Sequence, residues 1–172
     1  MPKTKGSPAD ARTRILEAAS EVVRREGALA LTLEAVAHKA GVSKGGLLYH
    51  FPSKEALVRG LLEHHLDQFE RALDETGQPF AEAYVRLGSY DGSRGLFSGM
   101  LAALALSPEL LEVVRQRYRS WQRRLPQSAE VWVAMLATDG LFVAEVLGIG
   151  TPQGEFREQV LRRMLELSRG KP

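Results

Sequence analysis

The chain has 172 residues, 44% of them hydrophobic and none of them cysteine, so a wholly disordered protein, disulfides and thiolate metal sites are all excluded. The net charge of +2 is unevenly divided: residues 1–55 hold nine Lys and Arg against six Asp and Glu, whereas residues 56–172 hold 14 against 15. This small basic excess fits an anionic partner such as nucleic acid, and it fits an ordinary solvated surface equally well.

The first residues, MPKTKGSPADARTR, are polar and basic and do not resemble a signal peptide. The longest uncharged run, Gly95–Pro108, has 14 residues and is too short to span a bilayer, so we interpret it as a buried helix. We therefore expect a cytoplasmic protein without a membrane segment.

Apolar residues recur at helical rather than strand spacing, which predicts an all-α fold. In the N-terminal half, helices are expected from Ser7 to about Gly27, from Thr32 to Gly41, from Ser43 to Phe51 and from Ser53 to about Gly77. Beyond Pro79 they are expected at about 79–89, 93–106, 108–124, 128–148 and 152–168. Three of these starts share a hydroxyl residue followed by proline, a pattern typical of a helix N-terminus: Ser7-Pro8, Ser107-Pro108 and Thr151-Pro152.

The segment GVSKGGLLYHFPSKEAL, residues 41–57, joins a short helix to another through a turn that begins with Gly41. Two short helices joined in this way form a helix-turn-helix, whose second helix enters the DNA major groove. Adjacent Gly45 and Gly46 weaken that helix, but bare backbone in its first turn lets phosphates or base edges approach closely. On geometry alone, a structural corner is as good an interpretation as DNA binding.

Further residues carry a specific resemblance: Ile15–Ala19, Thr32–Ala37, Gly41–Phe51 and Lys54–Leu57. From about residue 9 to 57 the sequence resembles the tetracycline-repressor (TetR) family of bacterial transcription regulators. The family's N-terminal domain typically contains Ile-Leu-x-Ala-Ala, then Thr-x-x-x-[Ile/Val]-Ala, then Gly-Val-Ser-x-Gly-x-Leu-Tyr-x-[His/Tyr]-Phe, then Lys-Glu-x-Leu. The resemblance implies a DNA-binding regulator, and operator DNA as its partner.

The resemblance also implies which residues contact DNA, mostly along its backbone, and it assigns Leu47 and Phe51 to the core. The expected DNA-binding residues are Thr32, Ser43, Lys44, Gly45, Gly46, Leu48, Tyr49, His50 and Lys54. Lys54 lies in the first turn of a helix, an unfavourable place for a cation unless an anion is near. Gly46 and Leu48 depart from the residues usual in the family, so the operator sequence of relatives cannot be transferred to this chain.

The resemblance implies a C-terminal domain that binds a small-molecule effector and forms a homodimer. We expect a flexible tail over residues 1–8, the helix-turn-helix domain over 9–52, a connecting helix over 53–77 and the ligand-binding and dimerisation domain over 78–172. Apolar and aromatic residues at helical spacing suggest a pocket for a flat or greasy ligand, although plain core packing explains each of them at least as well. The candidates are Phe97, Met100, Leu104, Tyr118, Trp121, Trp132, Met135 and Asp139.

Two charged features in this half have competing interpretations. Asp139 is the one charge on an apolar helix face, where it either meets a cationic ligand or is a partly exposed aspartate. Arg115, Arg119 and Arg123 share another face, which is either a second nucleic-acid patch or, as we expect, a solvated surface.

The segment VWVAMLATDGLFVAEVLGIG is apolar on more than one face and contains Gly140, so it needs a partner besides its own core. In the resembled family the last two helices form the dimer interface. The expected interface residues are Gly140, Val143, Leu147, Phe156, Val160 and Met164.

Two other classes of function compete with DNA binding. An enzyme would draw on Glu63, His64, His65 and Asp67, but the spacing of these residues does not converge on a metal, and we expect no cofactor and no catalytic site. The second rival is a helical ligand-binding or adaptor protein that keeps the helix-turn-helix only as scaffold. We expect a sequence-specific regulator, a repressor that a small apolar or aromatic ligand releases from DNA.

Overall fold

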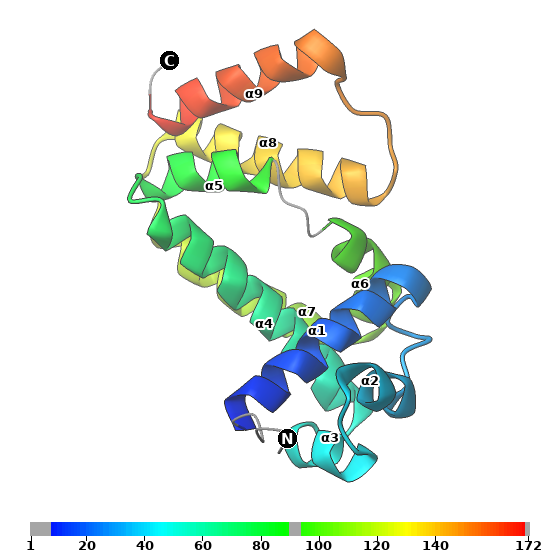
Figure 1. Ribbon diagram of the computed structural model, residues 1–172. Helices are drawn as coiled ribbons and strands as arrows, with labels where there is room; N and C mark the ends of the chain where they lie inside the picture. Colours follow the sequence, from blue (N-terminus) through cyan, green and yellow to red (C-terminus); the bar gives the residue numbers. More distant parts are fainter. Residues whose placement is uncertain (1–7, 90–93, 171–172) are drawn as a thin grey trace, which may run out of the picture. The chain divides into compact units, whose positions relative to one another are not determined.

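The computed structural model describes residues 8–89 and 94–170, and all regular structure in these ranges is helical (Figure 1). The helices are α1 (Pro8–Glu26), α2 (Leu33–Ala40), α3 (Lys44–His50), α4 (Lys54–Glu75), α5 (Phe80–Gly88), α6 (Arg94–Leu106), α7 (Pro108–Gln122), α8 (Ala129–Val146) and α9 (Gly154–Ser168). Each lies where the sequence predicts a helix, so the all-α expectation is confirmed. Ser7 and most of the expected tail lie outside the described residues.

Glycine ends three of the helices in the way that the sequence predicts. Gly27, Gly41 and Gly77 have φ angles of +83°, +65° and +64°, in the left-handed region that glycine adopts at little cost. At the end of α2, the Gly41 N–H points back to the last carbonyls of the helix. The sharp turn before α3 therefore follows directly from one residue.

The hydroxyl-proline pattern is right for α7 and wrong for α9. Helix α7 begins at Pro108, and the Ser107 hydroxyl accepts a hydrogen bond from its first turn. Helix α9 begins at Gly154 instead of Pro152, and no side chain caps it. Gly154 has a φ of +55°, so a right-handed helix that started at Pro152 could not continue through it.

The chain forms two compact units. The first contains the residues up to Leu66 together with Leu96–Val114, and the second contains Asp67–Gly95 together with the residues from Arg115 onward. Helices α4, α6 and α7 each contribute to both units. The first unit carries the helix-turn-helix domain, in which α1 packs against α2 and α3, the two helices of the motif (Figure 1).

Close backbone packing holds the core of the first unit together. Leu47 and Phe51 are buried there, which confirms their expected place. A side chain at Gly60 would meet the Phe51 ring, because its Cβ would lie 2.6 Å from Cε1. Gly99 lets α6 approach the backbone of α1 at Val23 in the same way. The remaining buried apolar side chains of this core include Ile15, Ala19, Leu31, Val36, Leu57 and Leu61.

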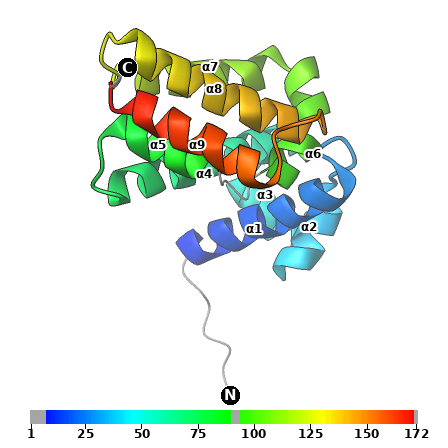
Figure 2. The ribbon, with the colours of Figure 1, turned by 90° about the horizontal axis from the view of Figure 1, so that it is seen from above.

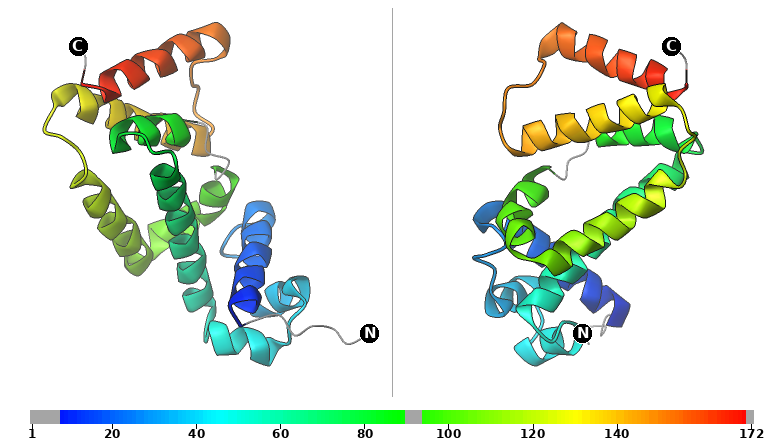
Figure 3. Two further views of the ribbon diagram at one scale, coloured as in Figure 1. Left: turned by 60° about the vertical axis from the view of Figure 1, so that its left-hand side comes forward. Right: turned by 180° about the vertical axis from the view of Figure 1, so that it is seen from behind.

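The second unit is built on α5, α8 and α9, which pack side by side (Figures 2 and 3). Val85, Ala134, Leu161 and Met164 form its buried centre, one or two from each helix. The Gly88 backbone lies against Thr138, where an added Cβ would come within 2.8 Å of the Thr138 methyl group. Helices α5 and α9 therefore hold α8 in place within the unit.

Arg117 of α7 and Arg124, which follows that helix, bind acidic residues of α4 within the second unit. Arg117 pairs with Asp67 and Glu70, and Arg124 donates to Asp74 at 2.6 Å. Carboxylates of the same chain thus hold this part of the arginine-rich helix. These pairs give Arg117 and Arg124 a structural role, and the interpretation of the face formed by Arg115, Arg119 and Arg123 stays a prediction.

No single helix among the described residues is long and apolar enough to cross a membrane. Helices α6 and α7 reach the required length and composition only when joined, and they are bent by 117° at the break between them. This bent pair by itself supports no membrane assignment.

Candidate DNA interface and effector region

The helix-turn-helix consists of α2, the turn 41–43 and α3. The Ser43 hydroxyl accepts a hydrogen bond from the Gly46 N–H at 3.0 Å, and the Thr32 hydroxyl accepts one from the Ala35 N–H at 3.2 Å. Each hydroxyl caps its helix and still has its own hydrogen to donate. Two of the predicted DNA contacts are therefore fixed at helix N-termini with a donor available for phosphate.

The adjacent glycines of α3 differ in what surrounds them. A Cβ built on Gly45 meets nothing within 4 Å, and the residue has no unusual φ angle, so the folded chain does not itself require glycine there. A Cβ on Gly46 would lie 3.2 Å from the Ser43 hydroxyl, so the helix cap partly explains that glycine. The packing of the folded chain therefore gives no reason for a glycine at position 45, and its approach to DNA stays a prediction.

Both lysines of the predicted interface contact their own chain. Lys44 pairs with Glu34 of α2 at 2.6 Å, and Lys54 donates to the Leu29 carbonyl oxygen at 2.6 Å. The carbonyl oxygen is a neutral acceptor within the chain, and its hydrogen bond offsets part of the cost of a cation in the first turn of α4. The DNA contact of Lys54 stays a prediction.

The remaining side chains of α3 project apolar and aromatic groups outward. Tyr49 is 82% exposed, Leu48 is also exposed, and His50 lies half-buried with its ring edge against Tyr49 at 5.1 Å between centroids. Leu48 and Tyr49 are suited to contact bases, for example a thymine methyl group.

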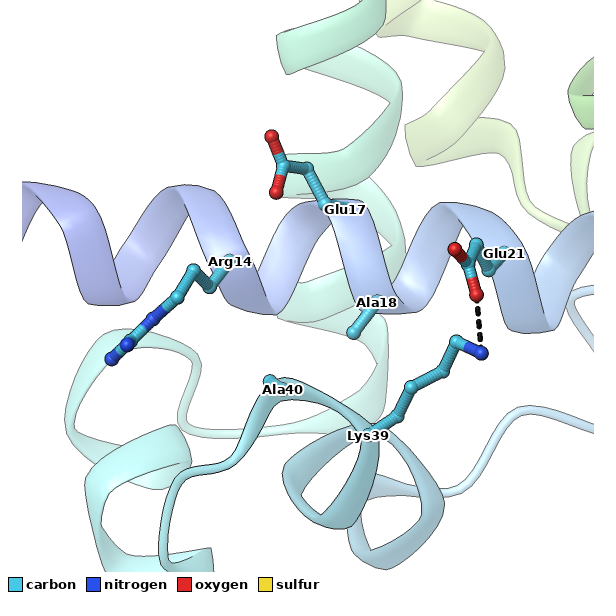
Figure 4. A pocket seen from close by; sticks show the side chains of 6 residues that line it. All are labelled: Arg14, Glu17, Ala18, Glu21, Lys39 and Ala40. Carbon is cyan, nitrogen blue, oxygen red and sulfur yellow. Dashed lines mark ion pairs between the residues drawn. The ribbon is translucent and has the colours of Figure 1, made fainter.

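A shallow hollow of ≈ 360 Å³ lies between α1 and α2, a feature that the sequence did not predict (Figure 4). An ion pair between Glu21 and Lys39 crosses it, and the hydrogen bond from Lys39 lowers the pKa of the Glu21 carboxyl. Its lining carries both signs of charge, contributed by Arg14, Glu17, Glu21 and Lys39. We interpret it as an open groove of the surface between two packed helices.

In the second unit, the Asp139 carboxylate of α8 binds two tyrosine hydroxyls. Tyr84 of α5 donates to Asp139 Oδ1 at 2.6 Å, and Tyr118 of α7 donates to the same oxygen at 3.2 Å. Burial raises the pKa of the Asp139 carboxyl, and these two hydrogen bonds oppose part of the rise. Burial also raises the pKa of both tyrosines, so their hydroxyls keep the protons that they donate.

Aromatic rings surround this carboxylate. The ring centroids of Phe69, Tyr84 and Tyr118 lie 5.6, 5.8 and 5.2 Å from that of Trp121, in tilted or edge-to-face arrangements. Trp121 is 2% exposed, and within the described residues its Nε1 donor has no hydrogen-bond partner. We call Phe69, Tyr84, Tyr118, Trp121 and Asp139 the aromatic-carboxylate cluster.

The cluster brings together three of the eight predicted ligand residues, namely Tyr118, Trp121 and Asp139. Met135 is buried and Trp132 half-buried on α8. The other three, Phe97, Met100 and Leu104, belong to the first unit, where Met100 is fully buried. Tyr84 and Phe69 belong to the cluster but are not among the predicted ligand residues. The sequence does indicate that Tyr84 lies four residues after Phe80, which places two aromatic rings on one face of α5.

An apolar stripe runs along the surface of α8. Its side chains are exposed and recur at alternating spacings of three and four residues, the pattern of a helix that packs against another helix. Gly140 lies within it, and an added Cβ there meets nothing within 4 Å. The members of the α8 stripe are Val133, Leu136, Gly140, Val143 and Leu147.

Of the other predicted interface residues, Phe156 of α9 is exposed and Val160 is half-buried. Met164 is 4% exposed in the core of its own chain, so its side chain is not free to meet a partner. Its apolar character serves the packing of α5, α8 and α9, which periodicity alone does not distinguish from an interface.

Known proteins match both parts of the chain. The family model "Bacterial regulatory proteins, tetR family" matches residues 15–61, and "Tetracyclin repressor-like, C-terminal domain" matches residues 78–169. The HTH-type transcriptional regulator UidR of Escherichia coli (strain K12) is 30% identical over 72% of this chain and 72% of its own length. The uncharacterized HTH-type transcriptional regulator YfiR of Bacillus subtilis (strain 168) is 29% identical over 85% of this chain and 68% of its own.

Among solved structures, the multidrug binding protein EbrR, in complex with malachite green, matches with a TM-score of 0.66 and 26% identity over 94% of this chain and 98% of its own. Regulators of this kind are not enzymes, and they act by binding DNA. The helix-turn-helix of the first unit, the two matching family models and the similarity to UidR together establish that this chain is a DNA-binding transcriptional regulator of the TetR family.

Proposed function

We propose that the protein is a cytoplasmic homodimeric repressor that binds operator DNA through α3 and releases it when a small apolar or aromatic molecule binds in the second unit. The outward-facing surface of α3 carries this proposal. Bare backbone at Gly45, the capping hydroxyl of Ser43 and an exposed Tyr49 occur together at one short helix. The similarity to EbrR, described as a multidrug binding protein, supports an effector of this kind.

The proposed DNA contacts divide by chemistry. Thr32, Ser43 and the first turn of α3 supply hydroxyl and backbone N–H donors for phosphate, whereas Leu48 and Tyr49 contact bases. Lys44, Lys54 and His50 add cations or donors around them. Since phosphate contacts carry no sequence information, base preference should respond to changes at Leu48 and Tyr49 only.

The direct test is binding of the purified protein to the DNA upstream of its own gene, followed by fluorescence anisotropy. Gly45→Leu should lower operator affinity by at least about a hundredfold, because a side chain would stand between backbone and DNA, while helix propensity rises. Gly77→Ala, at a left-handed position far from α3 in sequence, is a control that should perturb stability and leave DNA affinity alone. A stably folded Gly45→Leu protein with unchanged affinity would contradict this placement of DNA.

We propose that the α8 stripe and Phe156 of α9 form the dimer interface. About half of the surface of Val143 and Leu147 is exposed in the single chain, a cost that a second copy would remove. Gly140→Phe separates folding from assembly, because an added Cβ at this exposed position meets nothing within 4 Å in the single chain, whereas a packed partner helix would meet the ring. Sedimentation at micromolar concentration should show a dimer for the wild type and a shift toward monomer for Gly140→Phe.

Release of DNA by an effector requires that the effector bind the DNA-free conformation more tightly, by the same free energy that DNA affinity loses. Molecules that bind the second unit should therefore weaken operator binding in proportion to this difference. A ligand that binds the unit and leaves DNA affinity unchanged would contradict the proposed coupling for that ligand.

A further inference from the structure

The largely buried acids of the second unit differ in which groups compensate their negative charge. The Glu145 side chain is 15% exposed and pairs with Arg94 and with Arg157, and Glu82 pairs with Arg86 and Arg169. Asp139 lies on the same helix as Glu145, yet within the described residues no lysine, arginine or histidine forms an ion pair with it. Within the described residues, arginines thus pair with Glu82 and Glu145 and none pairs with Asp139.

The hydrogen bonds of Asp139 do not explain its charge. Both tyrosine hydroxyls donate to the single oxygen Oδ1, and a neutral amide oxygen could accept them without the cost of burying an ionisable acid. A carboxyl group at this position is therefore more than the fold needs. The second oxygen and the charge are left for another group.

The surroundings of Asp139 suit a cation that carries apolar groups. Aromatic faces are electron-rich and attract ammonium groups. Tyr84 and Tyr118 bind the carboxylate through their hydroxyls, and the rings of Phe69 and Trp121 pack against those two tyrosines. Trp121 Nε1 adds an unused buried donor in the same cluster. Phe69, Tyr118 and Asp139 are only half-buried, so part of the cluster is exposed to solvent.

We infer that the effector is an aromatic organic cation, whose positive group binds the Asp139 carboxylate and the aromatic faces around it. This inference rests on the proposed function, since it names the chemical class of the effector. The ammonium group supplies the counter-ion that Asp139 lacks among the described residues, and an acceptor atom on the ligand satisfies Trp121 Nε1. A neutral molecule of the same shape fills the same space and leaves the carboxylate without a partner.

Two probes of matched shape test the inference: 4-hydroxyphenyltrimethylammonium and 4-tert-butylphenol, which differ by one positive charge. Calorimetric titration should show that the wild-type protein binds the cation at least about tenfold more tightly than the phenol. Asp139→Asn keeps the shape and the acceptor oxygen and should bring this ratio close to one. Asp139→Glu, which keeps the charge, should retain part of the preference, and thermal melting confirms that each variant folds.

Operator binding measured on the same samples separates the inference from the proposed function. Release of DNA by the cation and not by the phenol supports both. Release by the phenol alone, equal affinity of the wild type for both probes, or an unchanged ratio in Asp139→Asn would overturn the cationic effector while leaving the regulator in place. A protein that prefers the cation through Asp139 but binds no upstream DNA would contradict the proposed repressor and leave the binding site.

Discussion

Two ion-paired regions, one in each unit, differ in how far water reaches their charged side chains. Lys44 and Glu34 join α3 to α2 with side chains 59% and 64% exposed, whereas Arg94, Glu145 and Arg157 join three helices with Glu145 only 15% exposed. Water competes strongly for the first pair and weakly for the second. The exposed pair can exchange one partner for a DNA phosphate, and the buried cluster is part of the framework of the second unit.

Glu145→Ala should produce the largest effect, because it leaves two arginines without their common acid. Removing one member of a largely buried ion pair costs about 3 kcal/mol of unfolding free energy, measured by urea denaturation. Glu166→Ala removes an acid from the half-exposed pair with Arg163 and should change stability by less than about 0.5 kcal/mol. Equal costs for the two variants would mean that Glu145 is as solvated as Glu166 and would erase the contrast.

Asp139→Asn tests a largely buried acid that forms no ion pair with an arginine of the described residues. With its pKa raised in the folded state, Asp139 binds more protons when folded than when unfolded, so wild-type stability falls as pH rises from about 3.9 through the raised pKa. Tyr84 and Tyr118 face this carboxyl and keep their protons throughout that window. The asparagine variant should therefore be the more stable protein above the window, by about 1.4 kcal/mol for each unit of the removed shift.

The measurement is the melting temperature of both proteins from pH 4 to pH 8. The difference between them should grow with pH and then level off. A wild-type protein that gains stability with pH over this range, relative to the variant, would mean that an unrecognised cation meets Asp139 and lowers its pKa.

These regions also differ in how far the sequence predicts them. The helix-turn-helix follows from local chemistry, since Thr32 and Ser43 cap helices within three residues of themselves and Gly41 forms the turn that it is suited to form. The aromatic-carboxylate cluster joins four helices, and nothing near Tyr84 in the sequence indicates that its hydroxyl reaches Asp139, 55 residues away. Met164 shows the same limit, because an apolar stripe does not reveal whether it faces its own core or a second chain.

Glu34→Gln should have the smallest effect on the fold and an opposite effect on function. Lys44 binds Glu34 in the free protein, and the hydrogen bond from Lys44 lowers the pKa of the Glu34 carboxyl. If Lys44 binds a DNA phosphate at neutral pH, it must leave Glu34 or hold both anions at once. Removing the negative charge should strengthen operator binding about two- to fivefold at low salt, and less at high salt, because both charges are screened by mobile ions. The melting temperature should not change measurably, since the pair is exposed.

Anisotropy titrations at several salt concentrations measure the effect. Glu63→Gln is the control, because Glu63 is an acid that pairs with Arg59 on α4. Weaker operator binding by Glu34→Gln would mean that Glu34 positions Lys44 for DNA instead of competing with it, and the exposed pair would then be part of the framework as the buried cluster is.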